Sequence, residues 1–500
     1  MRQKFSLSDD VMKIVQSLST TLGPNGKDKI LIDNEGHINT TNDGATILKN
    51  IKSNTIASLI LKDVCSVQDL ELGDGTTTIC CLIGEMLREA ENLMNQNIHP
   101  HSIIEGYRIS AKIVIDILRK SSFDNSFNYD IFLADLLDIA KTTLMSKFIS
   151  NYCETFSRIS LSVILKLKGN LNRGRINILK ILGGSLKDSY LDNGILIEKS
   201  FGIGQPKKLL NARIMILNCS LDSDKIKIYG AKVKVKKLSQ MAQIELSENK
   251  RLLDKCKKIL NHGINVVVNR QLIYDKQERF FTDHGIISIE NADFEGIEKL
   301  SLAVNSEIAS SFDDIKKIKI GKADLVEEIS IGSKNFVRFS GFENNGIGTI
   351  VIRGSTDEIL DEAERALNDT LCVLINSLKN SRFVWGAGCC ELKASRILQD
   401  ISKNFDFEYS KCLNSFARAL MSIPTIIAYN SDIDIKNLVK NIPLECYDLS
   451  SDSCLDLKNS KLGNARNLGI IEPLKLKIFT ILSATEAVEI FIRINKIFLN

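Results

Sequence analysis

Length, composition and charge exclude several classes of protein. The chain has 500 residues, more than one ordinary core holds, and its 44% hydrophobic and 25% charged residues are typical of a folded globular protein with several domains. The 65 basic and 61 acidic residues are spread along the sequence and leave a net charge of +4, so we expect no nucleic-acid partner. No apolar run reaches the ~18 residues of a membrane helix, so we expect no membrane anchor. The 12 cysteines show no C-x-x-C spacing, which favours buried thiols in a cytosolic protein.

Apolar spacing and turn residues predict a mainly helical first part of the chain. The first helical pattern ends at the turn Leu22-Gly23-Pro24, and a later turn, Asn42-Asp43-Gly44, opens another helical stretch. The elements predicted up to residue 146 are short strands at 29–33 and 37–41 and helices at 8–21, 47–51, 54–69, 79–97, 100–119 and 131–146.

The stretch Gly73-Asp74-Gly75-Thr76-Thr77-Thr78 carries the strongest chemical signal. It leads into a predicted helix, and a glycine turn at a helix N-terminus leaves backbone N–H groups free to bind phosphate. A carboxylate among phosphates needs a cation beside it, so Asp74 is predicted to bind Mg²⁺. The plain alternative is an Asp-Gly turn with a threonine cap, since short glycine motifs often match by chance. The second Asp-Gly turn, Asp43-Gly44, favours phosphate, because a nucleotide site usually draws on several loops.

The pattern changes after residue 206, where short apolar runs alternate with helices and indicate an α/β module. The strands predicted here are 213–218, 263–269, 285–290, 326–331 and 349–353, and the helices are 243–260, 275–282, 294–306 and 358–377. After residue 385 the predicted elements are helices up to 398, at 405–423 and on to 438, a strand at 474–479 and a final helix at 484–492. The order helical, mixed, α/β, mixed, helical predicts that the α/β module is inserted into the rest.

Four motifs together carry a resemblance to a known family: Leu22-Gly23-Pro24, Asn42-Asp43-Gly44-Ala45-Thr46, Gly73-Asp74-Gly75-Thr76-Thr77 and residues 361–371. In this order and spacing the chain resembles the group II chaperonin subunits over essentially its whole length. Within that family it is most similar to the beta subunits of the eukaryotic cytosolic chaperonin CCT, also called TRiC.

The resemblance implies a multidomain α/β fold, the chaperonin fold. A mainly helical equatorial domain would comprise residues 1–133 and 386–500, and a small intermediate domain would comprise 134–201 and 354–385. An α/β apical domain with a helical lid protrusion would span 202–353.

The resemblance also implies roles for individual residues. Asp74 would hold Mg²⁺ and Asp43 would help to position the attacking water. Asp369 would be the catalytic acid on the intermediate domain, accepting a proton from the water or orienting it, and would reach the γ-phosphate only after domain closure. Lys147 would sense the γ-phosphate. The residues implied to bind ATP are Leu22, Gly23, Pro24, Gly44, Gly73, Gly75, Thr76, Thr77, Thr78, Lys147, Gly386, Gly388 and Glu472.

The function implied is that of an ATP-hydrolysing chaperone subunit in the cytoplasm, with ATP and Mg²⁺ as cofactors. Its partners would be paralogous subunits in two stacked rings of eight, and its clients would be unfolded proteins such as actin and tubulin. Two alternatives stay open. A ring subunit that binds nucleotide but hydrolyses it slowly would fit Asn25 and Ala387, which depart from the family's Pro-Lys-Gly and triple-glycine patterns. A small-molecule kinase would need an acceptor pocket to which nothing in the sequence points.

Two segments of the α/β module are interpreted by their position. Residues 234–260 form an amphipathic stretch that is either an ordinary core helix or the lid segment of the family, and we favour the lid. Residues 294–306 match the client-facing helix, for which we expect Ile297, Leu300 and Leu302 to be exposed.

Overall fold

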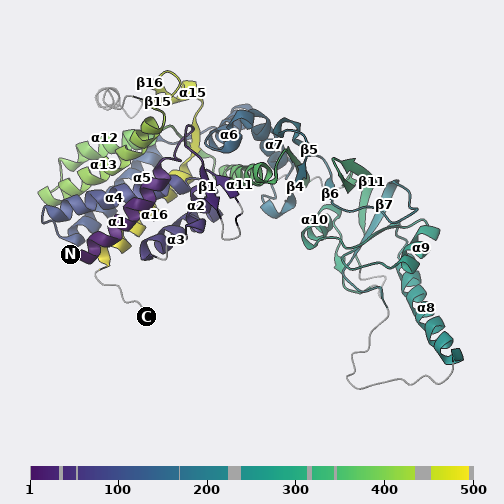
Figure 1. The fold of residues 1–500 in the computed structure, drawn as a ribbon. Helices are drawn as coiled ribbons and strands as arrows, with labels where there is room; N and C mark the ends of the chain where they lie inside the picture. The colour runs from purple at the N-terminus through teal and green to yellow at the C-terminus, as the bar shows by residue number, and fades with distance from the viewer. Residues whose placement is uncertain are drawn as a thin grey trace. The chain divides into compact units, whose positions relative to one another are not determined.

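The structure is a computed structural model that describes residues 2–32, 36, 38–51, 55–167, 169–222, 238–311, 318–342, 346–433 and 452–494. Two compact units make up the chain. Unit 1 combines Met1–Leu161 with Asp361–Asn500, and unit 2 is Ser162–Leu360 (Figure 1). The chain therefore returns to unit 1 after completing unit 2, and the finer division into five domain segments stays a prediction.

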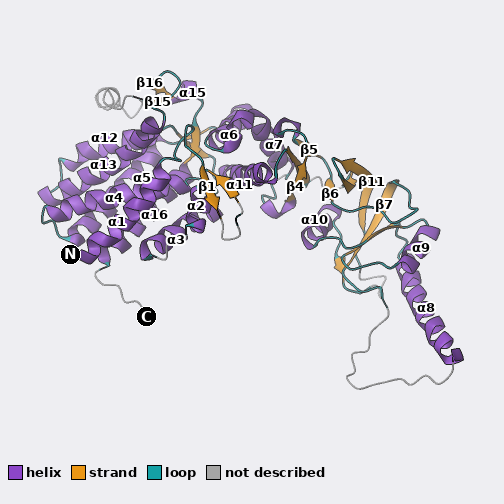
Figure 2. Ribbon diagram, viewed as in Figure 1, coloured by secondary structure: helices purple, strands orange, loops and turns teal. Residues whose placement is uncertain are grey.

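Unit 1 is mainly helical (Figure 2). Several of its helices begin at a capping side chain: Asp43, Thr55 and Asn128 accept hydrogen bonds from backbone amides in the first turns of α2, α3 and α6. Its helices are α1 Arg2–Ser19, α2 Gly44–Asn50, α3 Ile56–Leu72, α4 Thr76–Asn95, α5 Pro100–Ser121, α6 Tyr129–Met145, the 3₁₀ helix η1 Phe148–Tyr152, α12 Cys389–Ser402, α13 Phe407–Asn430, α15 Ala465–Leu468 and α16 Leu474–Arg493. Two further helices cross from one unit to the other, α7 Cys153–Lys166 and α11 Asp357–Lys379.

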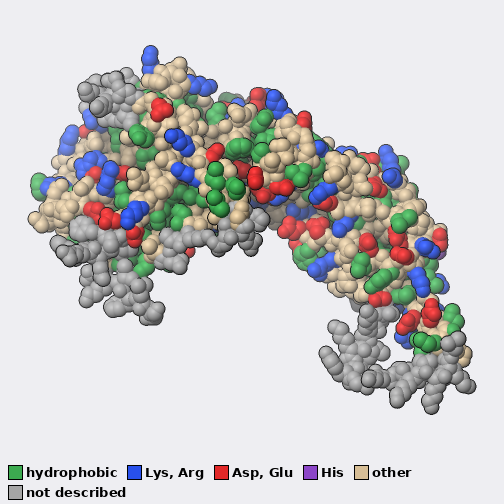
Figure 3. Space-filling model, in the orientation of Figure 1, with side chains coloured by type: hydrophobic (Ala, Val, Ile, Leu, Met, Phe, Trp, Pro, Cys, Tyr) green, Lys and Arg blue, Asp and Glu red, His purple; other side chains and the backbone are tan. Residues whose placement is uncertain are grey.

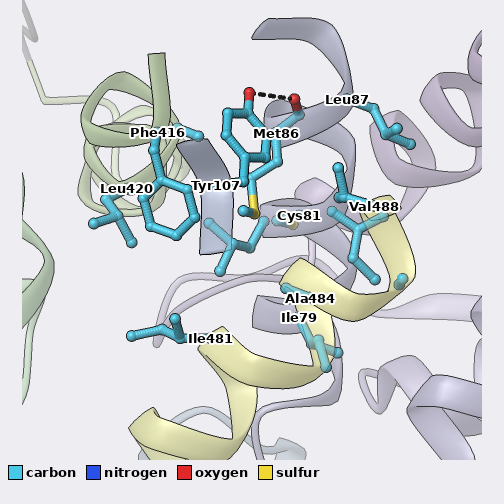
Figure 4. Packing of buried hydrophobic residues seen from close by; sticks show 14 of the residues in the cluster. Ile79, Cys81, Met86, Leu87, Tyr107, Phe416, Leu420, Ile481, Ala484 and Val488 are labelled. Atoms are coloured by element: carbon cyan, nitrogen blue, oxygen red, sulfur yellow. Dashed lines mark hydrogen bonds between the residues drawn. The ribbon is translucent and has the colours of Figure 1, made fainter. Parts of the chain in front are cut away.

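The core of unit 1 forms around α4, which packs against α1, α13 and α16. Apolar side chains of α4, α5, α13 and α16 meet there (Figure 4). The Tyr107 hydroxyl on α5 donates a hydrogen bond to the Met86 carbonyl oxygen (3.1 Å), and its ring meets Phe416 of α13 edge-on, with the centroids 5.5 Å apart. This core therefore joins helices from both ends of the sequence.

Among the described residues, three small sheets complete unit 1. The predicted strand pair near the N-terminus forms an antiparallel pair in which Lys29 faces Thr41, while residues 33–35 and 37 of its turn lie outside the described residues. The strands are β1 Lys29–Ile32 with β2 Ile38–Thr41, then β3 Phe123–Asp124, β14 Arg382–Trp385 and β17 Ile471–Pro473 in one sheet, and β15 Ser453–Asp456 with β16 Lys461–Asn464.

Unit 2 has the α/β character that the sequence predicts. Its larger sheet has the strand order β6-β12-β11-β7-β8-β9, and β10 also pairs with β7; β7, β8 and β9 run parallel. A second sheet has the order β4-β13-β5. The elements of unit 2 are η2 Arg173–Arg175, β4 Ile176–Leu182, η3 Leu186–Asp188, β5 Tyr190–Asp192, β6 Ile195–Ile197, β7 Lys208–Leu217, α8 Leu238–Leu260, β8 Val266–Asn269, α9 Asp275–Asp283, β9 Ile287–Ile289, α10 Phe294–Val304, β10 Ile308–Ala309, β11 Gly321–Ile331, β12 Lys334–Ser340 and β13 Gly348–Gly354.

The structure bears differently on the predictions for α8, expected to belong to the lid, and α10, expected to face clients. Most described side chains of α8 are exposed, and only its last turns are anchored, by the buried Cys256 and Ile259, so it is no ordinary core helix. Residues 234–237 of the predicted lid lie outside the described residues. The prediction for α10 is wrong for Ile297 and Leu300, which are 2% and 0% exposed because they pack against the sheet, while Leu302 is exposed as expected.

One secondary-structure prediction in unit 1 is also wrong. The predicted strand at residues 474–479 does not form. These residues form the first turns of α16, directly after the short strand β17. The helix is favoured because Leu474, Leu476 and Lys477 are all buried, which the alternating pattern of a half-exposed strand does not allow.

Candidate functional site

The candidate site lies in unit 1, where the N-termini of α2 and α4 meet. A Cβ atom on Gly44, the first residue of α2, would lie 2.7 Å from Thr77 Oγ1 and 3.1 Å from the Thr77 amide nitrogen. Only glycine lets the first turns of the two helices approach so closely. Two helix ends that both carry partial positive charge are therefore neighbours.

Asp43 caps α2 and links it to α4. Its carboxylate accepts hydrogen bonds from the Ala45 amide (3.3 Å), from the amide and hydroxyl of Thr46 (2.9 and 2.7 Å) and from the Thr76 hydroxyl (3.2 Å). Burial by itself would raise the pKa of Asp43. The charge of Lys147 and the hydrogen bonds from Thr46 and Ala45 outweigh it, so the pKa is lowered below its usual range. The Asp43 carboxylate is therefore ionised at neutral pH.

Two residues of the glycine loop between α3 and α4 have a left-handed backbone conformation. Gly73 and Gly75 have φ angles of 74° and 83°, which favour glycine at both positions. Between them, Asp74 accepts a hydrogen bond from the Gly75 amide (2.7 Å), and its carbonyl oxygen accepts one from Gln68 Nε2 (2.9 Å). Because the N-cap of α4 is a glycine, no cap side chain covers the amide groups of its first turn.

Lys147 and Asp369 form an ion pair beside this loop. Lys147 Nζ lies 2.9 Å from Asp369 Oδ2, and the two side chains are only 9% and 14% exposed. Lys147 follows α6, whereas Asp369 is on α11. A Cβ atom on Gly73 would lie 3.1 Å from the Asp369 carbonyl oxygen, so the backbone of α11 touches the glycine loop. Asp369 is therefore already beside the loop in this structure, and the expected closing movement stays a prediction.

Negative charge dominates the surroundings of Lys147. Burial is the main cause that raises the pKa of Asp369, to about 7, and the charges of Asp43 and Asp69 act in the same direction while Lys147 opposes them. Burial likewise raises the pKa of Asp69, whose Oδ2 lies 3.6 Å from Lys49 Nζ. Burial would lower the pKa of Lys147, but Asp369, Asp43 and Asp74 together raise it above its usual range. The site can therefore accept further positive charge.

The described residues contain no ready-made metal cage, because none of their groups of three or more His, Cys, Asp and Glu side chains has a suitable geometry.

A second buried charge group lies around Glu472 of β17. Lys477 Nζ is 2.7 Å from Glu472 Oε2 and 2.8 Å from Glu391 Oε1. Burial raises the pKa of Glu472, and the charges of Glu391 and Asp74 add to this effect while Lys477 opposes it. Gly386 packs on this group, since a Cβ atom there would lie 2.6 Å from Glu472 Oε1. The influence of Asp74 connects the group electrostatically with the glycine loop.

The turn Leu22-Gly23-Pro24 and the turn containing Gly388 both pack against α13. A Cβ atom on Gly23 would lie 3.4 Å from Ile427, and one on Gly388 would lie 2.9 Å from Pro424, three residues earlier on the helix. Asn430 Nδ2 also donates a hydrogen bond to the Leu22 carbonyl oxygen (2.8 Å). Two turns far apart in the sequence are thus held on one helix.

Thr78 has a different environment from the other residues of its motif. Together with Thr480, Glu391 and Lys477 it lines a cavity of about 20 Å³ between α4, α5, α12, α13 and α16. That volume is enough for one water molecule. Thr78 is partly buried and lines this small cavity, and its expected contact with nucleotide stays a prediction.

The sequence matches the TCP-1/cpn60 chaperonin family over residues 14–500. The chain belongs to this family. The chaperonin chain is 46% identical to T-complex protein 1 subunit beta of Saccharomyces cerevisiae over 484 residues, which cover 96% of this chain and 92% of the yeast protein. It is 44% identical to the Dictyostelium discoideum protein of the same name over 486 residues, with coverages of 97% and 91%, and 42% identical to the Homo sapiens protein over 482 residues, with coverages of 96% and 90%.

These matches confirm the resemblance to chaperonins and, within them, to the beta subunits, and the fold is the multidomain α/β chaperonin fold. Basic and acidic side chains of this chaperonin are interspersed over the face of each unit that Figure 3 shows. None of its described helices combines the length and apolar character of a membrane span.

Several residues of the chaperonin site were missed by sequence reasoning. Gln68 and Asp69 lie on the last turns of α3, directly before the glycine loop. This closeness in sequence to the loop could have indicated that they belong to the site. Lys477 and Glu391 are 86 residues apart and gave no local signal, because only the fold brings them together. Glu362 also gave no local signal, because it lies in a helix rich in charged residues. Its Oε1 accepts a hydrogen bond from the Thr41 hydroxyl (3.3 Å).

Proposed function

We propose that this chaperonin chain is a beta-type subunit of a cytosolic hetero-oligomeric chaperonin of the CCT/TRiC kind, and that it binds and hydrolyses ATP to drive lid closure. The observation that carries the ATPase proposal is the Lys147–Asp369 ion pair beside the uncapped N-terminus of α4. The names of the relatives, each a subunit beta of T-complex protein 1, support the subunit type. The proposed partners are paralogous subunits in two stacked rings of eight, and the proposed clients are unfolded proteins such as actin and tubulin.

The phosphates of ATP would bind at the glycine loop and the first turn of α4. Free amide groups and the positive end of a helix dipole both favour an anion there. Gly73 and Gly75 leave the backbone accessible, and the Thr77 hydroxyl adds a donor. The Thr76 hydroxyl, which donates to Asp43 in this structure, would have to turn from Asp43 to the phosphate. Lys147 would face the γ-phosphate, because it is buried at the same site and already neutralises Asp369.

We expect Mg²⁺ to be held jointly by the protein and the phosphates of ATP. This ion is commonly held by one or two carboxylates together with the phosphates of the substrate. Asp74 would supply the carboxylate. The bound ion would offset the charges of the phosphates and the neighbouring aspartates, which otherwise repel one another.

Hydrolysis would depend on the two other aspartates of the site. Asp369 would orient the attacking water or accept its proton, a task for which a carboxyl group with a pKa near 7 is suited. Asp43 would help to position the same water, since it is ionised and fixed by the first turn of α2. Lys147 would hold Asp369 in place until substrate arrives.

The nucleoside end of ATP would lie near the turns that α13 and β17 hold. Gly386, Gly388 and Glu472 would border the base and ribose, and Leu22-Gly23-Pro24 would line the nucleotide from the other side. Supporting this, α16, which begins two residues after Glu472, reaches the glycine loop, since a Cβ atom on Gly75 would lie 3.5 Å from Leu476 Cδ2.

Replacing Asp369 by asparagine tests the proposal. The side chain keeps its shape but can no longer accept a proton, so phosphate release from ATP should fall by about a hundredfold or more while nucleotide binding persists. Asp357→Asn, on the exposed start of the same helix, is the matched control and should leave both unchanged. Undiminished phosphate release from the Asp369→Asn chain would show that Asp369 is not catalytic.

A slowly hydrolysing ring subunit is the second candidate. The observation that favours it is Ala387, which has a φ angle of 52° and so occupies a conformation that favours glycine. A single-turnover measurement distinguishes the two candidates. The ATPase proposal expects rapid, Asp369-dependent hydrolysis of bound ATP, whereas the second candidate expects bound ATP to be hydrolysed only slowly.

The size of the native particle tests the assembly. Two rings of eight chains of about this mass, 55.8 kDa, would form a particle close to one megadalton. Native mass determination of the tagged full-length chain, recovered with its partners, should therefore give a particle of this size. A monomer of 55.8 kDa would contradict the ring and leave a kinase-like enzyme to be considered.

A further inference from the structure

One stripe of α11 carries three polar side chains, Glu362, Asp369 and Asn376, at a spacing of seven residues. Seven residues are close to two full turns of an α-helix, so the three side chains lie on the same face. All three belong to the part of α11 that lies in unit 1. Each of them contacts a different element of the site, and only the middle one has a role in the proposed reaction.

Glu362 reaches the segment that holds Asp43. Its Oε1 accepts a hydrogen bond from the Thr41 hydroxyl (3.3 Å), and the same hydroxyl accepts a hydrogen bond from the Asp43 amide (3.1 Å). Glu362 is 3% exposed and also pairs with Arg365 one turn further along α11 (2.9 Å). The first end of the stripe is therefore one side chain away from the backbone of Asp43.

Asn376 reaches the segment that holds the glycine loop. Its Nδ2 donates a hydrogen bond to the Glu71 carbonyl oxygen (2.8 Å), which belongs to the last turn of α3, two residues before Gly73. Its Oδ1 accepts a weaker hydrogen bond from Lys475 Nζ (3.4 Å). Cys372, one turn before Asn376, packs so closely on Gly73 that a Cβ atom there would lie 2.5 Å from the Cys372 Cβ atom.

Both ends of the stripe therefore hold α11 on elements of the site, with Asp369 halfway between them. We propose that Glu362 and Asn376 are positioning residues that fix the register of α11 and thereby place the Asp369 carboxylate for hydrolysis. This inference rests on the proposed ATPase function. Placement matters because a displacement of about 1 Å can reduce a catalysed rate by a hundredfold.

Asn376 is the sharper of the two tests, because it is only partly buried and its role depends on one donor group. Asn376→Ala in the full-length chain should lower kcat for ATP hydrolysis by about tenfold to a hundredfold, with KM and nucleotide affinity changed by less than about threefold. Asn376→Asp keeps the shape but removes the amide donor, so it should behave like the alanine variant. Lys475→Ala removes the donor to Asn376 Oδ1 and leaves the Nδ2 hydrogen bonds to the Glu71 and Cys372 carbonyl oxygens, so it should keep the normal kcat.

Glu362 is tested by a matched pair of variants. Glu362→Gln keeps an oxygen that can accept from Thr41 and should keep kcat within about threefold, whereas Glu362→Leu has a similar size but no acceptor and should lower kcat by tenfold or more. This pair gives an independent answer if the Asn376 variants do not fold.

A double variant shows whether the positioning residues act through Asp369. In the Asp369→Asn background, Asn376→Ala should cause no further loss of the residual rate. A further loss, or a normal kcat in the Asn376→Ala and Asn376→Asp chains while Asp369→Asn is inactive, would overturn this inference alone. Full activity of the Asp369→Asn chain would instead overturn the proposed function on which it rests.

Discussion

Asp369 is the residue in which burial, charge and geometry act most strongly on one another. It lies among other aspartates, with a pKa raised to about 7 chiefly by burial, and Lys147 is its ion-pair partner at 2.9 Å. A carboxyl group with this pKa changes its protonation state within the physiological range, unlike one with the ordinary value of 3.8. Its state therefore controls both the chemistry proposed for the site and the stability of the fold.

The first prediction is a dependence on pH with opposite signs for activity and stability. Protonated Asp369 cannot accept a proton, so kcat should fall as the pH is lowered through about 7. Because its pKa is higher in the folded than in the unfolded chain, this carboxyl group stabilises the fold fully below the ordinary value of 3.8. That contribution is lost as the pH rises through about 7. Rate profiles and urea unfolding across this range measure both, and an Asp369→Asn chain that kept the same acidic fall in kcat would contradict the assignment.

Gly44 gives the second prediction, which is steric. Its φ angle is not in the left-handed region, so Gly44→Ala acts through the 2.7 Å approach of the new Cβ atom to Thr77 Oγ1. Separating α2 from α4 should cost about 1–3 kcal/mol of unfolding free energy and weaken nucleotide binding. Gly174→Ala is a matched control, because the nearest atom to its Cβ would be at 3.4 Å, an ordinary contact. Equal stability of the two variants in urea would disprove the close packing of the helix ends.

Single residues of the site could be predicted from the sequence to the extent that they belong to local motifs. Asp43, Asp74 and the glycines lie in turns that open helices, and the structure gives them those positions. The pairing of Lys147 with Asp369, 222 residues later, follows from the fold, and only the family resemblance suggested both residues. Asp69 and Glu362 were missed because a charged residue in a helix usually faces solvent.

The helices of the core were predictable because their apolar spacing is strong, and the failures have local causes. The first turns of α16 alternate Leu and Lys, as a half-exposed strand does, but Lys477 is drawn inside by Glu391 and Glu472. A buried lysine in an apolar face cannot be recognised without its partners. In α10, the charged neighbours of Ile297 suggested exposure, although that residue packs on the sheet of unit 2.

The third prediction concerns the anchoring of α16. Lys477→Met removes the cation between Glu391 and Glu472 and leaves two buried carboxylates, so the unfolding free energy should fall by about 3–5 kcal/mol. Lys112→Met, at an exposed position of α5, should change it by less than about 0.5 kcal/mol. Denaturant unfolding of the two variants at neutral pH compares them. A loss of under 1 kcal/mol for Lys477→Met would mean that the group contributes no net stability.

At the scale of the whole molecule, the chain is a discontinuous unit with a continuous one inserted into it. Unit 2 has apolar cores of its own, which involve its larger sheet and α9 and α10. A smaller cluster joins β4, β6, β11, β12 and β13, and so connects its two sheets. All the residues needed for these cores come from one stretch of sequence.

The fourth prediction is that this stretch folds by itself. A fragment of residues 173–356 contains every strand of both sheets and should unfold in one cooperative transition in urea. A fragment of residues 173–342 lacks β13, the middle strand of the three-stranded sheet, and should be clearly less stable. Non-cooperative unfolding of the longer fragment would show that unit 2 depends on unit 1.

The insertion also sets the order in which the protein can fold while a ribosome makes it. Unit 2 is complete once residue 360 has emerged, whereas α1, α4 and α5 still lack α12, α13 and α16. At about 5–20 residues per second, the last 140 residues take roughly 7–28 s to synthesise. For that time the nascent chain exposes apolar helix faces, so this chaperonin subunit would itself need protection from aggregation before it could protect other proteins.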